Sequence, residues 1–101
     1  MAVTAKKLAS GTFGTSSATL YTAPAATQGI VKNIKVCNKN ASAAKYVTIL
    51  FDGVEVVYQH SIAAKDTINI PCSDVIEATK LITGLAESAD VTYYISGYEK
   101  S

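Results

Sequence analysis

Asp52 and Gly53 separate two runs rich in β-branched and aromatic residues, YVTILF (46–51) and VEVVYQH (54–60). An Asp-Gly pair accepts the positive φ angles of a type I′ turn, whose twist matches that of the strands it joins. The pattern predicts an antiparallel hairpin in which residues 47–51 pair with residues 54–58. No other local feature restricts the fold so strongly.

Similar short runs, each bounded by turn-forming residues, occupy most of the chain from residue 19 onward. Pro24 should end the run TLYT (19–22) sharply, because proline disfavours a helical residue before it. Pro71 should likewise end DTINI (66–70). KLITGLA (80–86) and DVTYYISGYE (90–99) complete the series.

The run IVKNIKVCN (30–38) has a period of two, as in a strand with one buried face. Strict alternation predicts Ile30, Ile34 and Val36 on one face and Val31 on the other.

At most one short helical turn is expected, over SDVIEA (73–78), where Asp74 could cap the turn. Without crossover helices the strands cannot form a parallel sheet. The sequence therefore predicts an all-β fold, an antiparallel β-sandwich of seven or eight strands, with jelly-roll or Greek-key wiring left open.

The chain of 101 residues is long enough for one domain and one core. Residues 1–18 are small and polar apart from Leu8 and Phe13. We expect an extended N-terminal arm over 1–18, lying on its own sheet or on a neighbouring copy, and a β-sandwich domain over 19–101. The alternative is that the arm is the first strand of the sandwich.

Charge and hydropathy exclude two classes of partner. Nine basic residues, all of them lysine, face eight acidic ones, giving a net charge of +1. Nucleic-acid binding normally requires a basic excess and the guanidinium fork of arginine, so we expect no nucleic-acid partner. No run is apolar enough for a signal peptide or a membrane span. We therefore expect a protein made in a cytoplasm, with no membrane partner.

No group of residues has the spacing of a catalytic or metal site. Cys37 and Cys72 are 35 residues apart and form no Cys/His cluster, so two reduced thiols are expected rather than zinc ligands or a disulfide. His60 is the single histidine, and its neighbour Ser61 should point to the opposite face of the strand. The acidic residues are dispersed. We expect no enzymatic activity, no metal and no cofactor.

Six tyrosines and no tryptophan supply most of the aromatic surface. Tyr93 should face the core, while Tyr94 and Tyr98 lie on the other face of the last strand. There they could contact a partner or stabilise the sheet as a cross-strand pair. The candidate partner-binding residues are Lys6, Lys7, Leu8, Phe13, Tyr94 and Tyr98.

Several segments resemble, in the same order along nearly the whole chain, a family of small β-sandwich virion structural proteins of tailed bacteriophages. The segments are KKL (6–8), TLYTAPAAT (19–27), IVKNIKVCN (30–38), ASAA (41–44), HSIAAKDTINI (60–70) and SGYE (96–99). The resemblance implies a non-enzymatic virion component made in the bacterial host, binding copies of itself and other capsid or tail proteins. Capsid decoration in many copies is the preferred role. The alternatives are a neck, tail or fibre-attachment component, or a receptor- or carbohydrate-binding module at the tail.

Overall fold

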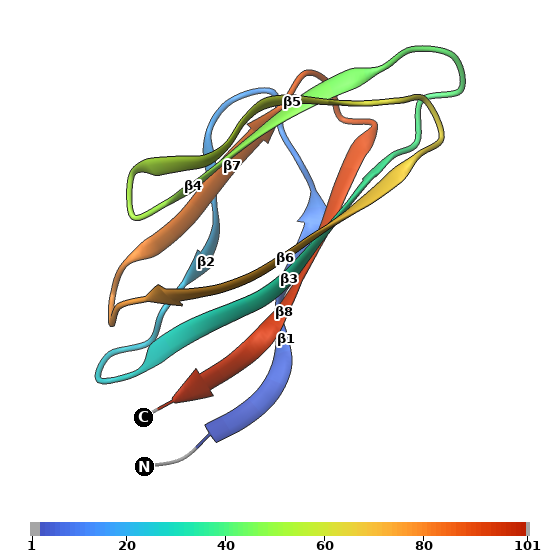
Figure 1. Ribbon diagram of the computed structural model, residues 1–101. Coiled ribbons are helices and arrows are strands. Elements are labelled where there is room, and N and C mark those ends of the chain that lie inside the picture. Colours follow the sequence, from blue (N-terminus) through green and yellow to red (C-terminus); the bar gives the residue numbers. More distant parts are fainter. Residues whose placement is uncertain (1–2, 101) are drawn as a thin grey trace.

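The structure is a computed structural model that describes residues 3–100. Within that range the regular elements are eight strands and no helix (Figure 1). The strands are β1 (Val3–Thr12), β2 (Ala18–Thr22), β3 (Gln28–Asn38), β4 (Lys45–Phe51), β5 (Val54–Ile62), β6 (Thr67–Ile76), β7 (Leu81–Ala86) and β8 (Val91–Lys100).

Two four-stranded sheets pack face to face, with strand orders β1-β8-β3-β6 and β2-β7-β4-β5. Every pairing is antiparallel, and β1 pairs with β8, β2 with β7, β3 with β6 and β4 with β5. The first half of the chain is thus folded back on the second half as one long ribbon, which is then rolled into a sandwich. This is the jelly-roll wiring. The predicted all-β antiparallel sandwich is confirmed.

The predicted hairpin is confirmed as well. Asp52 and Gly53 have φ angles of 50° and 79°, and Phe51 pairs with Val54 across the turn. The register then shifts, since Val57 rather than Val56 lies opposite Ile49. Val56 is therefore the extra residue of a β-bulge, which twists this end of β5.

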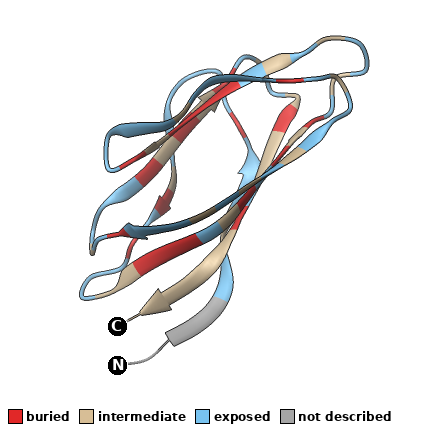
Figure 2. Cartoon of the chain, in the orientation of Figure 1, coloured by how far each residue is buried: buried red, intermediate tan, exposed pale blue. Residues whose placement is uncertain are grey.

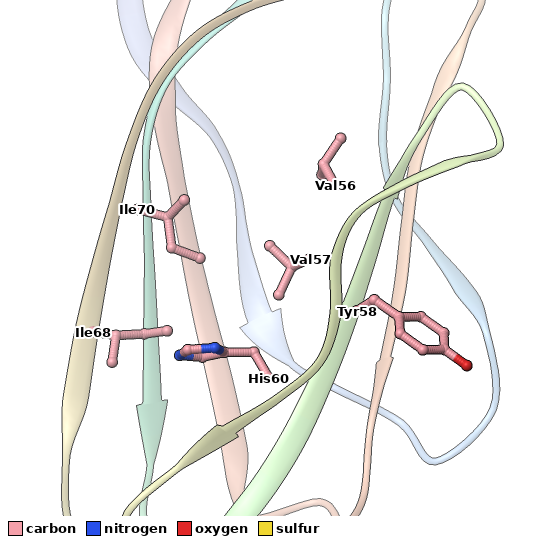
Figure 3. Close-up of a pocket in the computed structure, with 6 residues that line it drawn as sticks. All are labelled: Val56, Val57, Tyr58, His60, Ile68 and Ile70. Atoms are coloured by element: carbon pink, nitrogen blue, oxygen red, sulfur yellow. The ribbon is translucent and has the colours of Figure 1, made fainter.

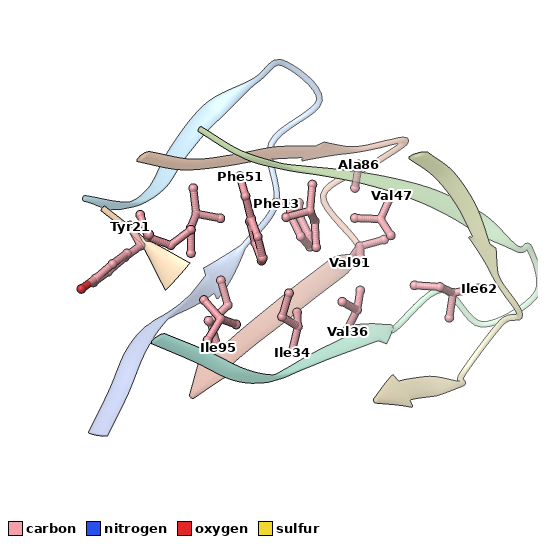
Figure 4. Packing of buried hydrophobic residues seen from close by; sticks show 14 of the residues in the cluster. Phe13, Tyr21, Ile34, Val36, Val47, Phe51, Ile62, Ala86, Val91 and Ile95 are labelled. Atoms are coloured by element: carbon pink, nitrogen blue, oxygen red, sulfur yellow. The ribbon is translucent and has the colours of Figure 1, made fainter. Parts of the chain in front are cut away.

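The core lies between the two sheets and consists almost entirely of aliphatic side chains, with Phe13, Tyr21 and Phe51 as its aromatic members (Figure 4). Buried positions recur along the central strands β3, β4, β7 and β8, while β5 is largely exposed (Figure 2).

Strict alternation over residues 30–38 was the wrong expectation. Val31 and Ile34 are both fully buried in the same core, although three positions separate them. The register shifts between Val31 and Asn33, so Lys32 is an extra residue that returns the pattern to the same face. Gly97 pairs with Val31 at this point, and a Cβ atom on Gly97 would collide with the carbonyl oxygen of Ile30.

The expected stop at Pro71 and the helical turn after it are also corrected by the structure. Strand β6 continues through Pro71 to Ile76. Proline is tolerated there because β6 is an outer strand that pairs with β3 alone and is irregular next to Pro71. Extended backbone also carries Ile76 into the core, where it is 1% exposed.

Much of the expected N-terminal arm is part of the sandwich. Strand β1 pairs with β8 from Val3 to Thr12, and the Phe13 amide then donates to the Val91 carbonyl at 2.9 Å. The Phe13 ring is buried, with its centroid 4.8 Å from that of Tyr93. Val3–Thr12 are thus paired as an outer strand of the first sheet, and Phe13 lies in the core.

Candidate functional site

The candidate site is the side of the sandwich where β5 and β6 lie, the outer strands of the two sheets. Each bonds to a neighbouring strand on one side only. Between them is a groove of about 300 Å³, lined by Val56, Val57, Tyr58, His60, Ile68 and Ile70 (Figure 3). We call this side of the molecule, formed by β5 and β6, the open side.

Strand β5 carries apolar side chains that the described residues leave largely exposed. Val54, Val56 and Tyr58 are 62%, 47% and 66% exposed. The bulge at Val56 contributes, because it turns Val57 rather than Val56 toward the interior. Large apolar side chains exposed on an outer strand, next to a groove, make this side the candidate contact site.

His60 is the polar group of the groove. It pairs with the fully buried Val47, and its ring extends toward Ile68, whereas Tyr58 points away (Figure 3). A second irregularity of β5 lies between Tyr58 and His60. There Gln59 has a φ of 46°, and its backbone N–H donates to the Thr48 hydroxyl at 3.0 Å. The groove can thus accept apolar side chains and offer one imidazole for a hydrogen bond.

The structure divides the sequence-predicted contact residues into two groups. Lys6 and Lys7 are exposed on β1 beside the half-buried Leu8, and β8 next to β1 carries the exposed Tyr94 and the half-buried Tyr98. These five residues therefore lie on adjacent strands, away from the groove.

Phe13 does not join them. It is 1% exposed and packs into the core, because the chain turns inward directly after β1. Phe13 is therefore not part of any partner surface that we propose.

A polar network connects β1, β2 and β8. The Tyr21 hydroxyl donates to Glu99 Oε2 at 2.6 Å, and Lys6 Nζ lies 3.1 Å from Glu99 Oε1. The hydrogen bond from Tyr21, together with Lys6, holds the pKa of Glu99 below its ordinary value although burial opposes this. Burial first, and then Glu99 itself, raise the pKa of Tyr21.

A second polar network fixes the loops at one end of the sandwich. Asn38 is fully buried, and its side-chain amide donates to the carbonyl oxygens of Ala43, Ile62 and Ala63. Asn40 donates to Asp90 at 2.9 Å, and this bond is the main reason that the pKa of Asp90 is lowered. These bonds are internal, so the network has a structural role.

Cys37 and Cys72 are free thiols, as expected. Burial, followed by the nearby Asp74, raises the pKa of the Cys72 thiol, which donates to the Val31 carbonyl oxygen at 3.4 Å. Among residues 3–100, no group of three or more His, Cys, Asp or Glu side chains is placed to hold a metal ion. Nor does that part of the chain contain a helix long and apolar enough to cross a membrane.

The open side was not among the sequence-predicted sites, although a signal for it existed. The run VEVVY (54–58) is apolar at four of five positions and follows a tight turn. A strand with apolar residues on both faces must be covered on both faces. Within the described part of the chain, Val54, Val56 and Tyr58 of β5 remain exposed.

Comparison with known proteins gives no family assignment: no family model and no curated protein matches the chain. Two solved structures of a pentameric capsid protein from metagenomic phage sequences match 92% of this chain at 12% and 13% identity, each with a TM-score of 0.38. The chain spans about three fifths of the length of those proteins, 61% and 62%. A structure of infectious bursal disease virus Gx strain matches 97% of this chain and 30% of its own at 16% identity, with a TM-score of 0.46.

Proposed function

We propose that this chain is a non-enzymatic structural component of a bacteriophage virion, and specifically a capsid decoration protein that binds the assembled shell in many copies. The observation that carries the proposal is the open side. A chain of 101 residues exposes Val54, Val56 and Tyr58 along one strand and leaves beside them a groove lined by aliphatic side chains and His60. An assembly with protein partners supplies the cover that this surface lacks.

The rest of the molecule agrees with a structural role. The described residues form a two-layer sandwich, and the polar networks around Glu99 and Asn38 connect its strands and loops to each other. The sequence resemblance to small virion proteins of tailed phages supports a location in the phage particle. A neck, tail or fibre-attachment component could have the same fold, because a fold does not determine where in the virion a protein is located.

The copy number per particle distinguishes a capsid decoration protein from a neck, tail or fibre-attachment component. The experiment is quantitative mass spectrometry of purified particles, with the chain measured against the major capsid protein. A copy number comparable to that of the major capsid protein is expected for a decoration protein. A small fraction of that number would instead support the neck or tail alternatives. Absence from purified particles would overturn the virion proposal altogether.

A second measurement tests attachment to the shell. Particles that lack the protein are incubated with the purified chain and then sedimented. A decoration protein should co-sediment and reach saturation at a fixed ratio to the shell protein. Failure to co-sediment with intact shells would contradict the decoration role.

A further inference from the structure

The two long sides of the sandwich carry opposite charges. Strands β1 and β2 include Lys6 and Lys7 and no acidic residue, a formal charge of +2. Strands β5 and β6 include Glu55 and Asp74 and no lysine, a formal charge of −2. Lys32 of the neighbouring β3 reaches β6, where it donates to the Ser73 hydroxyl at 2.7 Å, so Glu55 is the acidic side chain of this side farther from a lysine on the same sheet edge. All four charged side chains of β1, β2, β5 and β6 are exposed. Lys6 also bonds Glu99 on β8, while Lys7 forms no ion pair with any residue that the structure describes.

We propose that copies of this chain associate head to tail, with the acidic, apolar open side of one copy docked against the basic β1/β2 side of the next. The inference rests on the proposed structural role, because it specifies which surfaces neighbouring copies use. The occupant of the groove is therefore a second copy of the chain.

Charge favours this pairing over a symmetric one. If two open sides met, two surfaces of the same acidic sign would face each other, and like charges oppose association. In a head-to-tail arrangement, each contact instead joins a basic side to an acidic side, and the two attract each other. Because the two surfaces differ, the contact is heterologous, and repeating it produces a ring or an open chain of copies.

Apolar complementarity supports the same arrangement. The open side offers Val56, Tyr58 and the groove beside them. The β1/β2 side offers Leu8 and Leu20, which pack against the core but remain partly exposed. Apolar side chains of this kind can enter a shallow groove, and the charged residues around them then form a polar rim.

The size of the molecule is compatible with such a contact. Its Cα extents are 47 × 22 × 18 Å, so the outline of one long side is at most roughly 850 Å², of the same order as the ~800 Å² per partner of a standard interface. A stable contact would therefore engage most of each side.

The outer strands are irregular, so we expect two copies to dock through their side chains rather than by pairing strands into one sheet. Bulges interrupt β1 next to Leu8 and β5 next to Val56, and β6 contains Pro71. Bulges, lysines and prolines on outer strands prevent continuous pairing between sheets of different copies. The docked copies should therefore not form one continuous sheet.

The first test is charge reversal with matched controls, followed by sedimentation velocity at low salt. Glu55→Lys should raise the dissociation constant for self-association about tenfold or more, whereas Glu87→Lys, the same charge change in the loop after β7, should not. Lys7→Glu should weaken association similarly, and Lys35→Glu, on the exposed face of β3, should not. Equal effects in the test and control variants, or a chain that stays monomeric at all concentrations, would overturn the proposal.

The second test reports on geometry. In a Cys37→Ser, Cys72→Ser background, one batch carries Lys7→Cys and another carries Glu55→Cys. Under mild oxidation a mixture of the two should form cross-linked heterodimers in preference to either homodimer. Preferential cross-linking of Glu55→Cys to itself would mean that open sides meet each other, which contradicts head-to-tail docking. Copy number in particles is measured separately, so failure here would leave the virion proposal standing.

Discussion

Glu99 shows how one residue can make the stability of the sandwich depend on pH. Its pKa is below its ordinary value because Tyr21 donates to it and Lys6 lies beside it. The unfolded chain therefore takes up this proton at a higher pH than the folded chain does. The stabilisation is complete above the ordinary pKa and is lost as the pH falls through the lower folded value.

Tyr21→Phe removes the hydroxyl and should lower the free energy of unfolding at neutral pH by about 1 kcal/mol. It should also reduce the loss of stability between neutral and acidic pH, because the pKa of Glu99 then lies closer to its ordinary value. Denaturant unfolding at several pH values measures both effects. Tyr46→Phe, at an exposed tyrosine on β4, is the control and should change neither quantity.

Asn38 is a second residue whose role depends on hydrogen bonds. Asn38→Ala leaves the carbonyl oxygens of Ala43, Ile62 and Ala63 without this donor, and should lower the free energy of unfolding by about 1–3 kcal/mol. Asn33→Ala is the control, since the Asn33 amide makes a single bond, at 3.5 Å. Equal losses in chemical denaturation would contradict the structural role of Asn38.

At the scale of elements, the bulge in β3 depends on a glycine in β8. A Cβ atom on Gly97 would meet the Ile30 carbonyl oxygen, so Gly97→Ala forces backbone apart and should lower the free energy of unfolding by about 1–3 kcal/mol. Gly14→Ala is the matched control, because a Cβ atom there meets nothing closer than 3.7 Å. Thermal melting of both variants tests this, and a Gly97→Ala variant as stable as the wild type would refute it.

The elements also show which parts of the fold were predictable. The turn at Asp52-Gly53 is determined by two adjacent residues, so the hairpin followed from the sequence. The bulges did not, because Lys32 and Val56 become extra residues through pairing with strands far along the chain. The continuation of β6 past Pro71 likewise depends on β6 being an outer strand, which is a property of the wiring.

At the scale of the whole molecule, only part of the candidate surface could be predicted from the sequence. The lysines of β1 could be identified from the sequence as exposed charges, and Tyr94 could be placed on the outer face. The open side could not be placed, because the groove forms only when β5 and β6 of different sheets meet. Conversely, the sequence alone suggested that Phe13 could contact a partner, because the residues that bury it are distant in the chain. Its burial depends on β8 and on Tyr93, about 80 residues further along the chain.

Strand β1 contributes to the stability of the whole sandwich. Deleting residues 2–14 removes an entire strand of the first sheet and the Phe13 side chain, and exposes the edge of β8. The truncated chain should not unfold cooperatively on heating. Phe13→Ala tests the core contribution alone, and should lower the free energy of unfolding by about 3–5 kcal/mol, whereas Tyr94→Ala, on the exposed face of β8, should have little effect. A truncated chain with a sharp melting transition near that of the wild type would mean that the first strand is a detachable arm, and that the sandwich is complete without it.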